Sequence, residues 1–362
     1  MKKILVLVQD YPNNRGEVSL MYVHVRNKYY IQHGIDVTVL SFSTKTKYVI
    51  DNIPVISEEY YKIENTKYDV VVSHASNIRN HYRFLKKYGD KFERMIFFFH
   101  GHEVVMINEV YPKPYDYMKR ENWLRVRIQN GYDKWKLLLW HNFYKKFAFK
   151  SDFVFVSNWF HEEFQKYVKL SDSDLQGNVY IINNSVGKVF EDNSYSFDSD
   201  KEYDFITIRN NMDYSTYCID LVCELAEDNP QFKFLIIGKG EFFEHMHKPN
   251  NVTWINRYMQ HDEMLTYVNR ARCAIMLTRR DTQGVMSCEL VTYGIPLITS
   301  DLPVCHEIFR GITNVEYINN EVKNVKLDIS YKKILANRRE TKIQRFTYEN
   351  TVEKEEKLIT QN

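Results

Sequence analysis

Several features that would assign a function directly are missing from this chain of 362 residues. Its five cysteines have no metal-site spacing, and no apolar run approaches the roughly 20 residues of a membrane-spanning helix. Lys and Arg number 49 against 47 Asp and Glu, and this net charge of only +2 gives no indication of a nucleic-acid partner. The pattern G-x-G-x-x-G is also absent, which argues against a nicotinamide or flavin cofactor. We therefore expect a cytoplasmic protein without cofactor or metal.

Short apolar runs alternate with helical stretches along the chain, which predicts an α/β fold. Its length suits two domains. The predicted strands are 4–8, 35–40, 68–73, 95–100, 152–157, 179–182, 204–208, 232–237, 273–277 and 297–300. The expected division is a first domain over 1–187 with a returning C-terminal helix at 347–362, a polar linker at 188–202, and a second domain over 203–346.

The most informative stretch lies between the strands predicted at 273–277 and 297–300. Gly284 gives the backbone freedom to turn into a short helix, and Gly294 favours its end. The first amides of this helix would point out of its N-terminus, where the helix dipole favours an anion such as a diphosphate.

Two acids flank this helix start. Asp281 precedes the helix, and Glu289 lies about one turn inside it. A carboxylate at Glu289 can accept hydrogen bonds from both hydroxyls of a ribose, while Asp281 would face the transferred sugar. The spacing alone fits equally well an ordinary strand-loop-helix unit with two solvated acids.

Residues 281–296 resemble the Glu-x7-Glu signature of the retaining family-4 glycosyltransferases (glycosyl transferases group 1), with Asp281 in place of the first Glu. The resemblance implies the GT-B fold, in which two Rossmann-like β/α/β domains face a central cleft. It also implies a nucleotide diphosphate sugar donor, an acceptor hydroxyl, retention and no metal. The implied catalytic residues are Asp281, His100 and Glu289.

Weaker matches follow other predicted strands. The family's paired glycines are reduced to Gly16, and its phosphate-binding Lys is not evident. Either phosphate binding is weaker, or Lys239 or Arg279 supplies the second charge beside Arg209. The implied acceptor-side residues are His102 and Asn184. The implied donor-binding residues are Gly16, Arg209, Gly238, Lys239, Gly240, Arg257, Tyr258, Thr278, Gln283, Gly284, Val285, Met286 and Glu289.

Residues 113–150 are unlike the rest of the chain, because they hold ten Lys and Arg against three acids, interleaved with aromatics. Such a segment could rest on an anionic membrane surface, with rings at the headgroup level. Equally, the aromatics could pack in the core with the cations in solvent. The membrane alternative would place the protein peripherally on the inner face of the cell membrane.

Together these features favour a hexosyltransferase-type enzyme of bacterial surface polysaccharide (capsule or O-antigen type) synthesis. It would use a nucleotide-sugar donor and a glycan or lipid-linked glycan acceptor. The substitution at Asp281 and the missing Lys leave two alternatives open. One is a non-catalytic sugar-nucleotide-binding partner, and the other is a sugar-nucleotide epimerase or hydrolase of the same fold.

Overall fold

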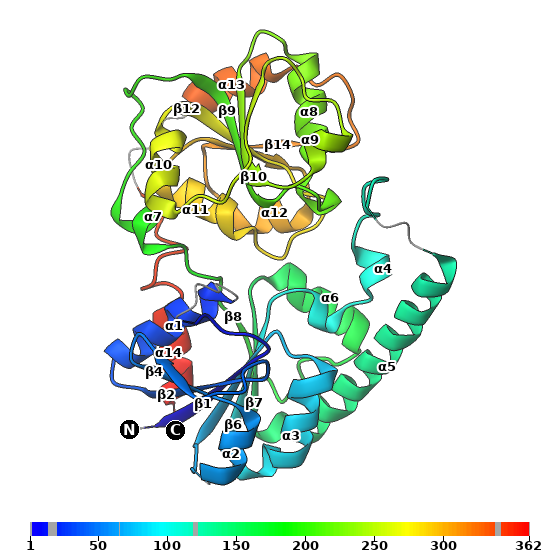
Figure 1. Cartoon of the computed structure of the whole chain (residues 1–362), viewed down its shortest axis with the longest axis vertical. Helices are drawn as coiled ribbons and strands as arrows, with labels where there is room; N and C mark the ends of the chain where they lie inside the picture. The colour runs from blue at the N-terminus through cyan, green and yellow to red at the C-terminus, as the bar shows by residue number, and fades with distance from the viewer. Residues whose placement is uncertain (1, 14–19, 65, 119–121, 337–341, 362) are drawn as a thin grey trace. The chain divides into compact units, whose positions relative to one another are not determined.

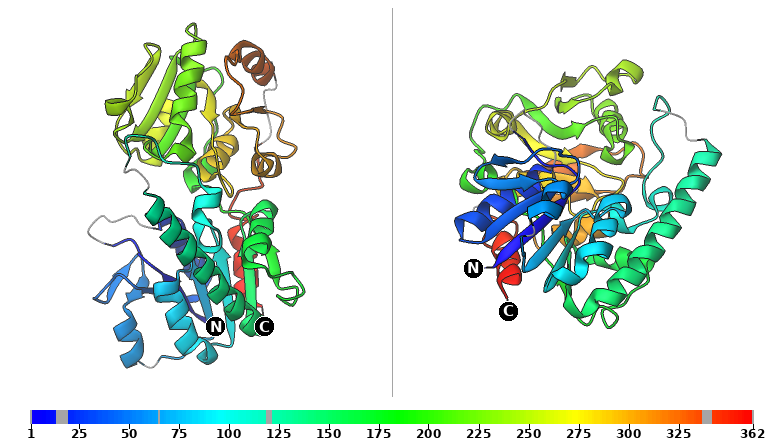
Figure 2. Two further views of the ribbon diagram at one scale, coloured as in Figure 1. Left: turned by 90° about the vertical axis from the view of Figure 1, so that its right-hand side faces the viewer. Right: turned by 60° about the horizontal axis from the view of Figure 1, so that its bottom comes forward.

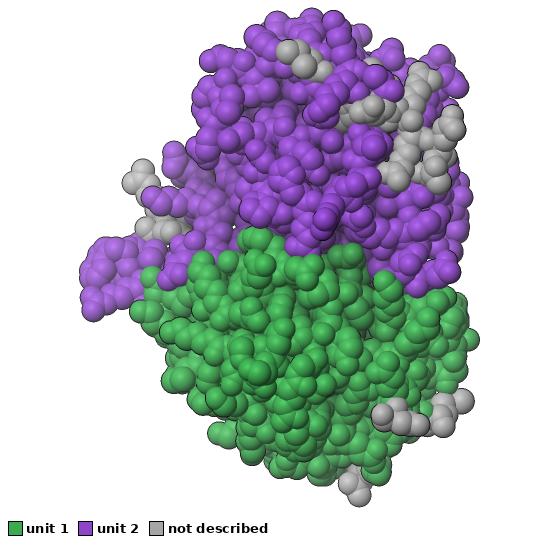
Figure 3. Space-filling view, turned by 180° about the vertical axis from the view of Figure 1, so that it is seen from behind, with its two compact units in different colours: residues 1–107, 128–183, 352–362 green, residues 108–127, 184–351 purple. Residues whose placement is uncertain are grey.

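The computed structural model describes residues 2–13, 20–64, 66–118, 122–336 and 342–361 (Figure 1). The chain forms two compact units, coloured separately in Figure 3. Unit 1 comprises residues 1–107, 128–183 and 352–362, and unit 2 comprises 108–127 and 184–351.

Unit 1 is built on a sheet of eight strands in the order β3-β4-β2-β1-β5-β6-β7-β8. All pairings are parallel except β3 with β4. The strands are β1 (Lys3–Val8), β2 (Asp36–Ser41), β3 (Tyr48–Ile50), β4 (Ile53–Ile56), β5 (Val70–His74), β6 (Arg94–Phe99), β7 (Ser151–Phe155) and β8 (Val179–Ile181).

The central strands of unit 1, such as β1, β5, β6 and β7, are buried along nearly their whole length. β6 reads RMIFFF, and its last five residues are buried. Phe97 and Phe99 stack on Phe153 of the neighbouring β7 with ring centroids 5.8 and 6.4 Å apart. The helices are α1 (Met21–Gln32), α2 (Glu58–Glu64), α3 (Arg83–Tyr88), α4 (Ile107–Val110, which runs into unit 2), α5 (Trp123–Phe147, which begins in unit 2), α6 (Asn158–Val168) and α14 (Val352–Thr360).

The C-terminal helix α14 packs in unit 1, although it is distant in sequence from the rest of that unit. Arg26 of α1 and Glu355 of α14 are both fully buried, with Nε 3.0 Å from the carboxylate. Tyr30 donates to the same carboxylate at 2.6 Å. A buried pair with this supporting hydrogen bond holds the chain terminus against α1.

Unit 2 contains a sheet of six strands in the order β11-β10-β9-β12-β13-β14, and every pairing is parallel. Its strands are β9 (Tyr203–Asn211), β10 (Phe234–Lys239), β11 (Val252–Ile255), β12 (Ala271–Met276), β13 (Leu297–Ser300) and β14 (Val315–Ile318). Its helices are α7 (Lys188–Asp192), α8 (Ile219–Asp228), α9 (Phe242–His245), α10 (His261–Asn269), α11 (Val285–Tyr293), α12 (Pro303–Ile308) and α13 (Leu327–Ala336).

The predicted fold class, α/β with two Rossmann-like domains, is confirmed, and the strands expected from apolar runs are all present within a few residues. Residues 188–202, expected as a linker, belong to unit 2. They include α7, and Phe190 and Tyr195 are buried. Tyr195 also donates its hydroxyl to the Ala271 carbonyl at 2.7 Å.

A segment from the first half of the sequence also belongs to unit 2. Residues 108–127 are part of unit 2, although the chain on either side of them belongs to unit 1. Tyr115 and Tyr117 lie against the unit 2 core and donate their hydroxyls to Asp220 and Asp213 at 2.9 and 2.8 Å. No local pattern in the sequence indicates this long-range packing.

Candidate functional site

The candidate site in unit 2 follows from the order of its strands. From β9 the chain proceeds to β10 and β11 on one side, and it then crosses to β12, β13 and β14 on the other. Ligands of open parallel sheets bind outside the carboxyl ends of the strands at such a reversal. Arg209 lies near the end of β9, and residues 277–284 follow β12, so both lie at this point.

Arg209 is a buried cation whose hydrogen-bonding capacity is only partly used. Its Nη2 donates to the Leu277 carbonyl, and its guanidinium lies 5.0 Å from the ring centroid of Tyr217. Among the described residues Nε has no hydrogen-bond partner, and burial lowers the pKa of Arg209. A buried donor without a partner is rare in folded proteins, and an anionic ligand would satisfy it.

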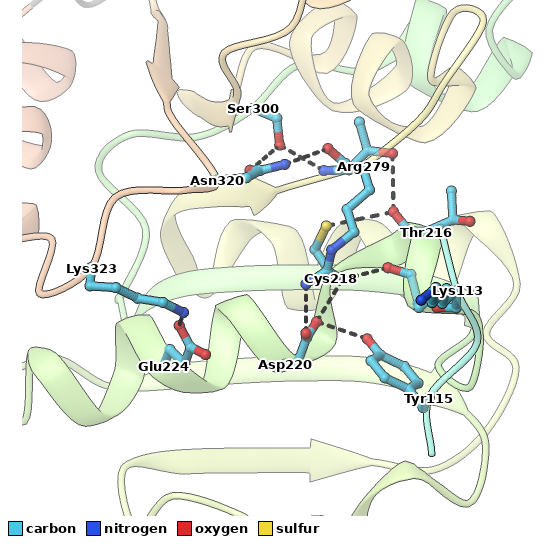
Figure 4. Close-up of polar contacts among 12 residues, drawn as sticks. Lys113, Tyr115, Thr216, Cys218, Asp220, Glu224, Arg279, Ser300, Asn320 and Lys323 are labelled. Carbon is cyan, nitrogen blue, oxygen red and sulfur yellow. Dashed lines mark hydrogen bonds and ion pairs between the residues drawn. The ribbon is translucent and has the colours of Figure 1, made fainter. Parts of the chain in front are cut away.

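The loop after β12 is fixed by a polar network (Figure 4). The Thr278 amide donates to Ser300 Oγ at 2.8 Å, and its carbonyl accepts from Asn320 Nδ2 at 2.9 Å. Ser300 Oγ donates in turn to Asn320 Oδ1 at 2.8 Å. Thr278 is therefore part of the support of the loop in this structure.

Arg279 forms a bidentate ion pair inside unit 2 (Figure 4). Its two terminal nitrogens lie 2.9 and 2.6 Å from the carboxylate of Asp220 at the start of α8. The pair is about a quarter exposed, and Tyr115 donates to the same carboxylate. Because Asp220 neutralises it, Arg279 is not a spare charge for a phosphate in this arrangement.

Asp281 turns back onto its own loop. Its Oδ1 accepts the amides of Thr282, Gln283 and Gly284 at 2.8, 3.1 and 2.7 Å. The Gly284 amide, expected to be available to a ligand, is therefore occupied. The short side chain of Asp explains this geometry, because it can reach the following amides as a helix-capping residue does.

Gln283 holds Asn184 by a reciprocal pair of hydrogen bonds. The Asn184 amide donates to Gln283 Oε1 at 2.6 Å, and Gln283 Nε2 donates to the Asn184 carbonyl at 2.9 Å. Both residues are buried in unit 2. The Gln283 side chain, expected on the donor, is thus bound to the backbone of Asn184, a residue expected on the acceptor side.

The helix that was predicted to begin after Gly284 is present as α11. Gly284 adopts φ +74° and Gly294 adopts φ +109°, so both ends use the left-handed backbone region that favours glycine. Val285 and Met286 open the helix, where amides have no acceptor within the helix itself. These two amides remain candidates for binding a diphosphate.

Glu289 lies inside α11 and is only 5% exposed. Its Oε1 accepts the Gly187 amide at 3.0 Å. Burial raises the pKa of Glu289 to about 7, which the Gly187 amide partly opposes. A Cβ at position 187 would lie 2.9 Å from His261 Nδ1 and 3.2 Å from Glu289 Oε1, so glycine leaves room for this carboxyl.

The loop after β10 contains the expected Gly238, Lys239 and Gly240. A side chain at Gly238 would collide with the Arg209 carbonyl, 2.3 Å from its Cβ, so the glycine permits close approach of β9. Lys239 Nζ lies 5.6 Å from the ring centroid of Tyr258, which is 61% exposed.

Arg257, another residue expected to bind the donor, forms an ion pair within unit 2. It pairs with Glu263 on the surface, with Nη1 2.8 Å from Oε2. Both side chains are exposed by more than two fifths. Arg257 therefore lies on the surface, paired with Glu263.

In unit 1, His100 follows β6 as expected and is joined to a second histidine. Its Nε2 lies 3.1 Å from Nδ1 of His74, which ends the adjacent β5. Burial lowers the pKa of His100 to about 3 and holds the pKa of His74 well below its usual value, so both rings are neutral. Glu103 accepts the His100 and Gly101 amides and fixes this strand end.

His102, expected on the acceptor side, is exposed, and its carbonyl accepts Lys136 Nζ at 3.2 Å. Gly16 lies outside the described residues. The structure adds residues that the sequence did not single out: His74, Asp220, Ser300 and Asn320. Of these only His74 carries a recognisable signal, since it ends an apolar strand in the same way as His100.

Comparisons with known proteins place the fold. No protein-family model matches the chain, and no curated protein matches it by sequence. Among solved structures, sucrose-phosphate synthase from Thermosynechococcus elongatus is similar at 11% identity over 99% of this chain and 98% of that chain, with a TM-score of 0.72.

Two further solved structures are similar to this chain over nearly its whole length. A glycosyltransferase from Rickettsia africae matches at 14% identity over 99% of this chain and 97% of its own, with a TM-score of 0.67. Anabaena HepE in complex with UDP and glucose matches at 11% identity over 99% and 100% of the two chains, with a TM-score of 0.66. These similarities cover both units, and the chain has the GT-B fold.

Proposed function

We propose that this protein is a glycosyltransferase that moves a sugar from a nucleotide diphosphate sugar to an acceptor hydroxyl, with retention and without a metal. The observation that carries the proposal is the grouping at the reversal of strand order in unit 2. Arg209 lies at this edge of the sheet and is buried, with Nε lacking a hydrogen-bond partner among the described residues. Helix α11 begins at the same edge and carries the buried Glu289. The solved structure of HepE, similar in fold, contains UDP and glucose.

Each group has a role that its chemistry suits. Arg209 and the first amides of α11 would stabilise the departing diphosphate, where negative charge develops in the transition state. Glu289 would accept hydrogen bonds from the ribose hydroxyls. In unit 1, burial lowers the pKa of His100 to about 3, so this ring would offer a sugar a hydrogen bond rather than a charge.

Asp281 has a different role in this proposal from the one expected of it. Because Oδ1 accepts three successive amides, it orders the loop that leads into α11. Its second carboxylate oxygen remains the candidate for orienting the sugar. The protein would work in bacterial surface polysaccharide synthesis, in the cytoplasm, on a glycan or lipid-linked glycan acceptor.

One observation favours a second candidate, a sugar-nucleotide-binding protein without transfer activity. Arg279, a candidate for the second phosphate-binding charge, is neutralised by Asp220. Only Lys239 is then left as a candidate for that charge, and without it stabilisation of the leaving group would be weaker.

The test is a nucleotide-release assay with uridine, guanosine and adenosine diphosphate sugars, with and without an acceptor extract. Thermal shift first identifies the base, because a donor that binds only the folded state raises its stability. Acceptor-dependent release that is lost in Glu289→Ala supports a transferase. Donor binding without release supports the binding protein, and release without transfer supports a hydrolase.

A further inference from the structure

Helix α5 has a second face that the transferase chemistry does not use. Trp140, Phe143, Tyr144 and Phe147 are buried and stack in the core of unit 1, so these four aromatics are structural. The opposite side of the helix leaves large apolar side chains in solvent. Figure 2 shows α5 running along the surface, toward the viewer in its left panel. The exposed fractions are 64% for Ile128, 43% for Tyr132, 51% for Trp135 and 59% for Leu138.

These four residues, which we call the α5 face, lie on one side of the helix. Their spacing of four, three and three residues matches the turn of an α-helix, so the side chains form a continuous stripe. Ten residues at about 1.5 Å each give a stripe roughly 15 Å long. Trp123 and Leu124 in the first turn of α5 are exposed as well, at 72% and 47%. Contiguous apolar surface of this kind marks an interaction site.

Every exposed charge that α5 itself carries is positive. The only acid in α5 is Asp133, which is fully buried and lies 2.9 Å from Lys136 Nζ. Of the exposed cations, Lys145 also contacts Asp174 at 3.2 Å. The exposed cations of the helix are Arg125, Arg127, Lys134, Lys145 and Lys146.

We propose that the α5 face docks on an anionic lipid bilayer, with α5 lying parallel to the surface. Trp135 and Tyr132 are suited to the headgroup level, Ile128 and Leu138 to the acyl boundary just below it, and Lys134 to the lipid phosphates. A second copy of the chain is a poorer occupant, because pairing two such faces would bring cations together. Within the described residues, no helix has the length and apolar composition to cross a bilayer.

The test is co-sedimentation of the full chain with vesicles, which requires neither donor nor acceptor and so stands apart from the transferase assay. Vesicles of phosphatidylcholine alone are compared with vesicles containing 30% phosphatidylglycerol, at low and high salt. The expected result is binding to the anionic vesicles that weakens as salt rises. Binding to neither vesicle at low salt would overturn the proposal, and so would equal binding to both.

Variants on exposed positions test the surface without disturbing the core. The double variant Trp135→Ser with Leu138→Ser is expected to weaken binding at least tenfold, and Lys134→Glu about fivefold or more, since each Lys near an anionic surface contributes about that factor. The matched control is Ile63→Ser on α2, because Ile63 is 79% exposed but lies on another helix. Equal losses for the control and the double variant would overturn the assignment to the α5 face.

Two further measurements distinguish the occupant. Light scattering without lipid is expected to show no dimer that depends on Trp135, and a dimer abolished by Trp135→Ser would assign the face to a second copy instead. Brominated lipids are expected to quench tryptophan emission in the wild type and much less in Trp135→Phe. Unchanged quenching in that variant would place the contact elsewhere.

Discussion

Glu289→Gln tests the central electrostatic feature of unit 2. Glu289 is 5% exposed and has one backbone donor, the Gly187 amide, at 3.0 Å. Its pKa is raised from 4.5 to about 7, chiefly by burial. A carboxyl whose pKa is raised on folding contributes stability below the unfolded value of 4.5, and that contribution is lost as pH rises through 7.

The magnitude follows from the shift. From 4.5 to about 7 is about 2.5 pKa units, which corresponds to about 3 kcal/mol of unfolding free energy lost by pH 8.5. Glutamine is neutral at every pH and retains an acceptor for Gly187. The stability of the variant relative to the wild type should therefore be about 2.5 kcal/mol higher at pH 8.5 than at pH 5, because part of the loss has already occurred at pH 5.

The assay is urea unfolding of both proteins at pH 5.0 and pH 8.5. Unfolding is monitored by hydrogen exchange of the α11 amides, so that unit 2 is observed by itself. Glu241→Gln is the control, because its side chain is 71% exposed. If the two proteins differ in free energy of unfolding by the same amount at both pH values, the pKa of Glu289 is not raised by burial. In the same variant, donor binding should be weakened, because the ribose hydroxyls lose a charged acceptor.

Three other perturbations test the loop and the core. Asp281→Ala should cost about 1–2 kcal/mol of unfolding free energy in urea titration while Asp281→Asn costs much less, since Asn keeps an acceptor for the three amides; equal losses would contradict the capping role. A double-mutant cycle on Arg279→Gln and Asp220→Asn should give a coupling of about 1 kcal/mol, and additivity would show that the bidentate pair contributes nothing. Burial lowers the pKa of His81 to about 3, so on acidification only the unfolded chain protonates it near its normal pKa and stability falls. Relative to His81→Leu, the wild type should lose up to about 1.4 kcal/mol per pH unit between pH 6 and 4, and parallel pH profiles would rule this out.

The fold was predictable because its signals are local. The parallel strands are buried on both faces and therefore read as unbroken apolar runs, as in Met95–Phe99, and parallel strands need helical crossovers. Gly284 and Gly294 marked both ends of α11, because only glycine adopts their backbone conformation without strain.

The side-chain partners were not predictable, because they join residues far apart in the chain. Nothing local to Arg279 indicates Asp220, and nothing local to Asn184 indicates Gln283, which lies 99 positions later. The division of aromatics in 113–150 was equally hidden. Trp135 is exposed and Trp140 is buried, although both are tryptophans of the same helix. Only their positions around the axis of α5 distinguish them.

Two features of unit 2 that are unfavourable to stability are ones that a donor would satisfy. Arg209 holds a buried Nε without a partner among the described residues, and Glu289 holds a carboxyl whose ionisation burial opposes. A diphosphate would accept from Arg209, and ribose hydroxyls would donate to Glu289 and favour its ionised form. Donor affinity should therefore rise as pH increases through 7, with a proton released on binding below that pH. Calorimetry in two buffers of different ionisation enthalpy measures that proton, and binding without release at pH 6.5 would mean that the ribose does not contact Glu289.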